Sequence, residues 1–170
     1  SKGGIALSNE NYGLIYGTAG TIAFILGSIL SGYYISHFGL KKTLFSLVCI
    51  FNIPFAVYLI LAIFQPSNLW WIGTGIVFEY FSYGFGFVGI TLFMMQQIAP
   101  GKYQMAHYAF ANSLMNLSVM VPGMLSGKLA TAFGYQTFFI IVLLVTLPAI
   151  IMAIRLPFAH AVEAKKSDSK

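Results

Sequence analysis

The feature that most constrains this sequence is a series of long apolar runs separated by short breaks rich in glycine, proline and lysine. The runs cover residues 12–37, 43–64, 69–97, 104–133 and 136–156. A helix needs about 20 mostly apolar residues to cross the hydrocarbon core of a bilayer. We expect no strands here, because apolar and polar residues do not alternate along the runs. We therefore predict an all-α membrane protein, a bundle of about five transmembrane helices.

The composition leaves too little charge for a surface that faces water. Only 8% of the residues are charged and 58% are hydrophobic, whereas soluble domains have about 25% charged residues. This argues against a soluble domain, and the hydrophobicity argues against disorder. The net charge of +5 does not indicate a nucleic-acid partner, because the basic residues lie at the ends of the runs rather than in one patch. Anionic headgroups of the lipid bilayer suit them better.

The breaks and the basic residues predict the topology. The breaks fall at 39–42, 65–68, 99–102 and 133–135, so neighbouring helices are expected to be antiparallel. One side holds Lys41, Lys42, Lys102, Arg155, Lys165, Lys166 and Lys170, and the other holds Lys2 and Lys128. Cytoplasmic loops carry an excess of lysine and arginine. We therefore expect the N-terminus outside the cell and the C-terminus in the cytoplasm.

Two units are expected, a transmembrane bundle over residues 1–157 and a polar cytoplasmic tail over 158–170. The chain does not begin with methionine, and its first residues do not form a signal peptide. Five spans with ends on opposite faces would make an unusual complete protein. We therefore expect the sequence to be part of a longer one.

Glu79 is the only acidic residue within a run. It lies roughly ten residues from the outer end of its helix, at a depth of about 15 Å near the membrane midplane. An acid at that depth is protonated, paired with a cation or in contact with water, and such residues usually have a role. Glu79 is therefore our candidate for proton coupling or solute binding. The alternative is a hydrogen-bonded acid that only joins helices.

Polar residues on two helices extend this candidate site. Tyr83 and Gln97 share the helix face of Glu79, and we expect both to hydrogen-bond the solute. The run 104–133 carries a stripe of Tyr108, Asn112 and Asn116. That stripe is interpreted either as a water-lined pathway or as a helix interface, where each such hydrogen bond contributes about 0.6 kcal/mol.

Small residues four apart predict where helix backbones touch. The pairs are Gly13 with Gly17, Ser28 with Gly32, and Gly123 with Gly127. Because such pairs allow close approach, the first and fourth helices are expected to pack most tightly.

Bond-breaking chemistry has no recognisable motif here. There is no phosphate-binding loop, no Gly-x-Ser-x-Gly and no His-Glu-x-x-His, and Cys49 is the single cysteine. We therefore expect no enzyme activity, no metal and no cofactor.

Residues 32–42 resemble the loop signature of the major facilitator superfamily, Gly-x-x-x-Asp-Arg-x-Gly-x-Lys/Arg-Lys/Arg. The matching positions are Gly32, Gly39, Lys41 and Lys42. Ser36 and His37 stand where the signature has Asp and Arg, so the resemblance does not extend to the charge-based latch in this half. Later segments are similar to AmpG-type permeases of that superfamily, namely residues 79–86, 107–109, 112–113, 122–127, 133–135 and 138–139.

The resemblance implies that the runs are helices 8–12 of a twelve-helix transporter whose N-terminal half is not in this sequence. It implies import of a small-molecule solute, a cell-wall muropeptide, across the bacterial inner membrane, driven by protons. Glu79, Tyr83 and Gln97 would then face the central cavity, and the glycine pairs would lie at or near the interface between halves. The alternative is a membrane-embedded binding or scaffold module that moves no solute.

Overall fold

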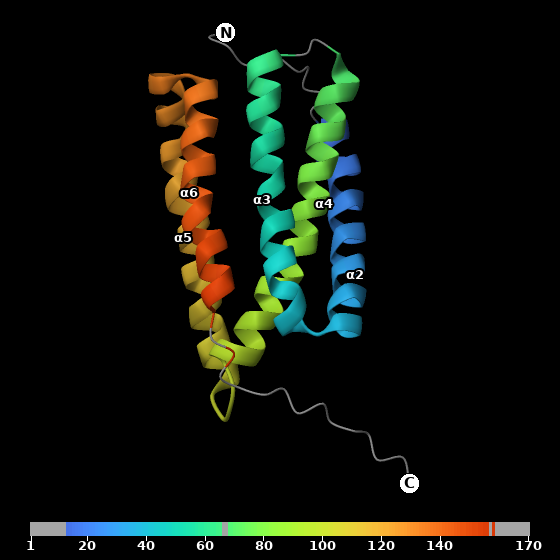
Figure 1. Cartoon of the computed structure of the whole chain (residues 1–170), viewed down its shortest axis with the longest axis vertical. Coiled ribbons are helices and arrows are strands. Elements are labelled where there is room, and N and C mark those ends of the chain that lie inside the picture. Colours follow the sequence, from blue (N-terminus) through green and yellow to red (C-terminus); the bar gives the residue numbers. More distant parts are fainter. Residues whose placement is uncertain (1–12, 66–67, 157, 159–170) are drawn as a thin grey trace.

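A computed structural model of the chain describes residues 13–65, 68–156 and 158, and its regular elements are all helices (Figure 1). They are the π-helix η1 (Gly13–Ala19), α2 (Gly20–Phe38), α3 (Leu40–Phe64), α4 (Leu69–Phe93), the π-helix η2 (Met94–Ile98), α5 (Gln104–Phe133) and α6 (Tyr135–Arg155). The all-α prediction is confirmed. Except for Phe158, the predicted tail lies outside the described residues.

Single glycines separate two pairs of consecutive helices. Gly39 has a φ of +82° and Gly134 a φ of +79°, in the region that favours glycine because it has no Cβ. The break predicted over residues 39–42 is therefore shorter than expected. Lys41 and Lys42 belong to the first turn of α3 rather than to a loop.

Four helical stretches are long and apolar enough to cross a membrane. They are Gly13–Phe38, Leu40–Phe64, Trp70–Ile98 and Tyr135–Arg155. The fourth predicted span, residues 104–133, forms the 30-residue helix α5, which runs antiparallel to α6 (Figure 1). It is not among the four, because polar residues such as His107, Asn112 and Lys128 interrupt its apolar sequence.

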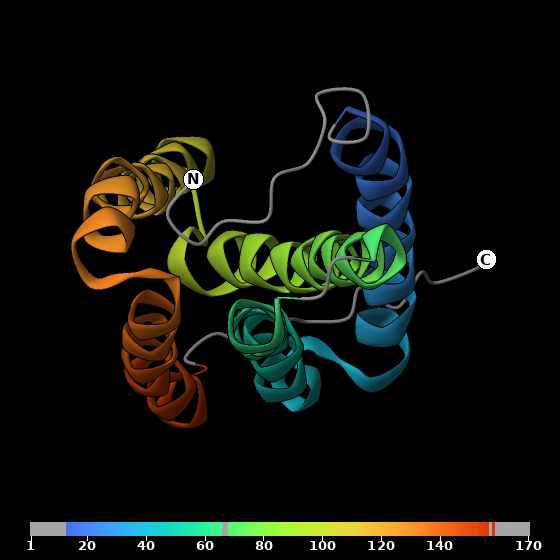
Figure 2. The ribbon, with the colours of Figure 1, turned by 90° about the horizontal axis from the view of Figure 1, so that it is seen from above.

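The helix α4 holds the bundle together. It has its most extensive contacts with α2 and also packs against α3, which in turn packs against α6. Figure 2 shows α4 crossing the middle of the molecule, with α2 near its start and α5 near its end. Among the described elements, α5 contacts only α6 and η2, so the bundle is dense around α4 and sparse around α5.

Close approach of α2 and α4 depends on one glycine from each helix. A Cβ at Gly27 would collide with the carbonyl oxygen of Phe81, and a Cβ at Gly84 with that of Phe24. Beside them, the Ser28 hydroxyl donates a hydrogen bond to the Gly84 carbonyl oxygen, with 3.3 Å between the two oxygens. The two backbones therefore touch where they cross.

Most residues of the predicted small-residue pairs do not lie at the α2–α4 crossing. A Cβ would meet nothing within 4 Å at Gly13, Gly17, Gly32, Gly123 and Gly127. Of the six residues in those pairs, Ser28 is the one that contributes to the α2–α4 crossing. The expectation that the fourth run packs tightly is wrong, since α5 has no buried residue. Small residues four apart allow two helix backbones to approach closely. Whether they do so depends on the side chains of the facing helix.

Candidate functional site

Glu79 receives a hydrogen bond from a neighbouring helix. It lies on α4 about 15 Å along the axis from the start of that helix, and it is the only acid among the described residues. The Tyr58 hydroxyl, on α3, donates a hydrogen bond to Glu79 Oε2. Both side chains are half-buried, so the carboxyl group has a fixed partner within the span.

Aromatic rings surround the Tyr58–Glu79 pair. The Tyr58 ring stacks on Phe139 of α6, with the ring centres 5.6 Å apart and the planes at 14°. Tyr16 of η1 lies close to the Tyr58 hydroxyl group. Side chains from η1, α3, α4 and α6 therefore meet at this point. A carboxyl group held in this way can accept a proton or bind a hydroxyl or amine group of a solute.

Tyr83 lies one turn further along the same face of α4. Its ring centre is 5.4 Å from that of Phe51 on α3 and 5.8 Å from that of Phe24 on α2. The side chain is still 43% exposed. Tyr83 thus lies one helical turn from Glu79, with its ring between two helices and part of its surface accessible.

Gln97 does not join this site. It is half-buried in η2, about 27 Å along the helix axis from Glu79. The change from α-helix to π-helix after Phe93 also alters the residue spacing on which the shared face was predicted. Gln97 therefore lies near the other end of the span, where Gln104 of α5 donates to the Met95 carbonyl oxygen at 3.4 Å.

The predicted stripe on α5 is also separate from Glu79. Tyr108 and Asn112 are half-buried, whereas Asn116 is exposed and donates to the Asn112 carbonyl oxygen within its own helix at 2.8 Å. Lys128 is exposed on α5, and α5 does not contact α4, so Lys128 does not pair with Glu79. Within the described part of the chain, no group of three or more His, Cys, Asp or Glu is placed to hold a metal ion.

The loop signature lies at the junction of α2 and α3. Ser36 donates to the Tyr33 carbonyl oxygen at 2.8 Å, and the His37 ring is parallel to the Tyr33 ring at 6.4 Å. Where the signature has two charged residues, this chain thus has side chains engaged within their own helix. The start of α3, the connection between η2 and α5, and the end of α6 lie at one end of the bundle (Figure 1). These segments carry Lys41, Lys42, Lys102 and Arg155.

Sequence reasoning missed Tyr58. The available signal was weak: Tyr58 is the single tyrosine in the run 43–64, placed well inside it. A lone phenol at membrane depth needs a partner, but nothing in the sequence indicates which helix supplies it. Phe139 was part of the family resemblance and had no assigned role.

Comparison with known proteins finds a family match over almost the whole chain. A family model described as Major Facilitator Superfamily matches residues 4–170. A protein of Rickettsia felis named "Putative transporter AmpG 1" is 26% identical over 142 residues, covering 81% of this chain and 31% of that protein. A Rickettsia conorii protein of the same name is 24% identical over 143 residues, covering 81% and 32%.

A Haemophilus influenzae protein without an assigned function is 24% identical over 153 residues, covering 86% of this chain and 36% of that protein. The chain therefore spans about a third of the length of these curated relatives. No solved structure matches it.

Proposed function

Because the chain belongs to the major facilitator superfamily, we propose that it is part of a secondary active transporter that works by alternating access. Such transporters bind the solute near the midplane and expose it to each side in turn as two bundles rock. The remainder of the transporter supplies the second bundle. The membrane-spanning helices and the family match support this proposal.

The observation that carries the proposal is the Glu79 carboxyl group with its Tyr58 hydrogen bond inside the span. We assign Glu79 the role of proton carrier or solute ligand, with Tyr83 as its neighbour in solute binding. Gln97 follows the C-terminal end of α4, away from Glu79. We therefore propose that it hydrogen-bonds the solute at a different point of the pathway from Glu79. Tyr108, Asn112 and Asn116 remain candidates for the pathway or for contact with the second bundle.

The solute class follows from the similarity to AmpG-type permeases. We propose proton-coupled import of a sugar-peptide derived from the cell wall, such as a muropeptide, across the bacterial inner membrane. The relatives' printed names say only that they are transporters, so the solute is the finer part of the proposal. A solute with many hydroxyl and amide groups fits a site whose ligands are a carboxyl and a phenol.

The test is Glu79→Gln in the full-length parent transporter, measured as solute uptake into vesicles under an imposed proton gradient. The variant keeps the size of the side chain and its ability to accept from Tyr58, but it cannot exchange a proton. We expect gradient-driven uptake to be abolished with normal expression, and Lys128→Gln, at an exposed site on α5, to behave as wild type. Uptake by Glu79→Gln that is unchanged across pH would contradict the coupling role.

A further inference from the structure

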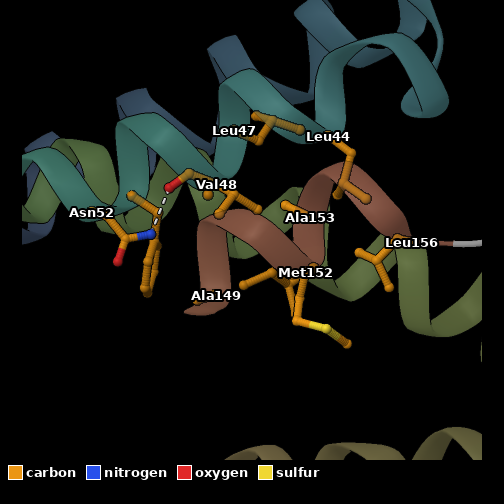
Figure 3. A pocket seen from close by; sticks show the side chains of 11 residues that line it. Leu44, Leu47, Val48, Asn52, Ala149, Met152, Ala153 and Leu156 are labelled. Atoms are coloured by element: carbon orange, nitrogen blue, oxygen red, sulfur yellow. Dashed lines mark hydrogen bonds between the residues drawn. The ribbon is translucent and has the colours of Figure 1, made fainter. Parts of the chain in front are cut away.

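A cavity of about 340 Å³ lies between α3, α4 and α6 (Figure 3). Leu47 and Phe51 of α3, Gly86 of α4, Met152 of α6, and Leu156 directly after α6 are among the residues that line it. The α6 side also presents Ala149 and Ala153, one turn apart. These two small side chains leave space that a larger residue would fill.

The lining excludes a polar ligand. Asn52 is the single polar side chain among the lining residues, and its amide nitrogen already donates to the Val48 carbonyl oxygen at 2.7 Å. Beyond the remaining amide atoms of Asn52, the lining side chains offer a sugar or peptide no hydrogen bond in place of those it would lose to water, which costs several kilocalories per mole. The ligand that fits this cavity is an apolar chain.

Basic residues lie at one end of the cavity. Leu44, which lines it, is one turn after Lys41 in α3, and Leu156 directly follows Arg155 at the end of α6. The Lys41 ammonium group is 6.0 Å from the centre of the Phe158 ring, and Phe158 packs against the apolar cluster that includes Leu44. This puts the Lys41 charge beside the cavity.

Nothing in the described part of the chain neutralises this charge locally. The only acid there is Glu79, on α4 about two turns from Gly86 and towards the opposite end of the bundle. Within the described part of the chain α6 has no buried residue, so these elements leave its surface exposed. An apolar cavity with cations at its membrane-surface end matches a molecule with an acyl chain and an anionic headgroup.

We propose that this cavity binds one acyl chain of an anionic phospholipid, whose headgroup is held by Lys41 and Arg155. The chain fills the space left by Ala149 and Ala153 and links α3 to α6. This site is independent of Glu79 and of the transported solute.

The first test needs no variant. The full-length parent is reconstituted with phosphatidylglycerol that carries a photoactivatable group on its acyl chain, and adducts are mapped by mass spectrometry. We expect adducts concentrated in 44–52 and 149–156, with phosphatidylcholine of the same chain giving much weaker labelling there. Labelling spread evenly over the exposed faces of α2 and α5 would overturn the proposal. Adducts between two protein molecules through α6 would also overturn it, because they would show that a second copy occupies the cavity.

The second test uses variants and the same labelling assay. Ala153→Phe fills the cavity and should lower the adduct yield at 44–52 about tenfold, a difference of about 1.4 kcal/mol in binding. Ile151→Phe is the matched control, because Ile151 is on the same helix and 51% exposed, and it should label as wild type. Equal labelling of both variants contradicts an acyl chain in the cavity.

The headgroup contact is tested separately. The double variant Lys41→Gln with Arg155→Gln should lose the preference for phosphatidylglycerol over phosphatidylcholine, about tenfold or more for two basic residues. Lys128→Gln, at the other end of the bundle, should keep it. A preference that survives in the double variant rejects the proposed headgroup site.

Discussion

At the scale of single residues, the hydrogen bond from Tyr58 to Glu79 joins α3 to α4 inside the membrane. Tyr58→Phe removes the hydroxyl group and keeps the ring that stacks on Phe139. The half-buried carboxyl group then loses its donor. We expect the free energy of unfolding to fall by about 1–3 kcal/mol, measured by denaturant titration in detergent micelles.

A control and a double-mutant cycle isolate this interaction. Tyr33→Phe, on a residue that is 72% exposed, should change stability by less than about 0.5 kcal/mol. Combining Tyr58→Phe with Glu79→Met should give less than the sum of the two single effects, with a coupling of about 0.5–3 kcal/mol. Strict additivity would show that the two side chains do not stabilise each other.

The sequence predicts half of this pair. Glu79 stands out because an acid within an apolar run is costly, and its depth follows from counting residues. Tyr58 cannot be found in that way, because tyrosine is common in membrane helices and carries no charge. Which helix supplies the donor depends on the tertiary arrangement. The same limit explains Gln97, whose predicted place assumed a straight α-helix that becomes a π-helix after Phe93.

At the scale of helices, the α2–α4 crossing depends on the absence of a side chain at Gly27. Gly27→Ala would drive a methyl group into the carbonyl oxygen of Phe81. We expect a loss of about 1–3 kcal/mol, as for other overpacked contacts, seen as a lower midpoint of thermal unfolding in detergent.

Gly32 provides the comparison on the same helix. A Cβ at Gly32 meets nothing within 4 Å, so Gly32→Ala should leave stability unchanged or raise it by up to about 1 kcal/mol through better helix propensity. If both alanine variants destabilise equally, the crossing does not depend on close backbone contact at Gly27.

Helix positions were predictable, and helix partners were not. The apolar runs place α3, α4 and α6 to within a few residues, because bilayer thickness fixes how long a span must be. Their apolar residues are spread around the whole helix, since lipid tails are as apolar as leucine and favour no one side. The sequence alone does not show that helices touch at Gly27 and Gly84 and not at Gly123 and Gly127. That difference depends on the side chains of the facing helix.

At the scale of the whole molecule, the distribution of basic residues predicts the orientation. Reporter fusions after Gly101 and after Lys170 should both read as cytoplasmic, and a fusion after Gly134 should read as periplasmic. The physical reason is that Lys41, Lys42, Lys102 and Arg155 share one end of the bundle, and such residues are retained in the cytoplasm. A periplasmic signal after Lys170 would reverse the predicted topology.

The single-residue joint at Gly134 bears on how the protein is made. α5 is not among the four stretches that are apolar enough to cross a membrane, and α6 is the most hydrophobic of those four. Because one residue separates them, we expect the two helices to enter the membrane together as a hairpin, with α6 supplying most of the hydrophobicity.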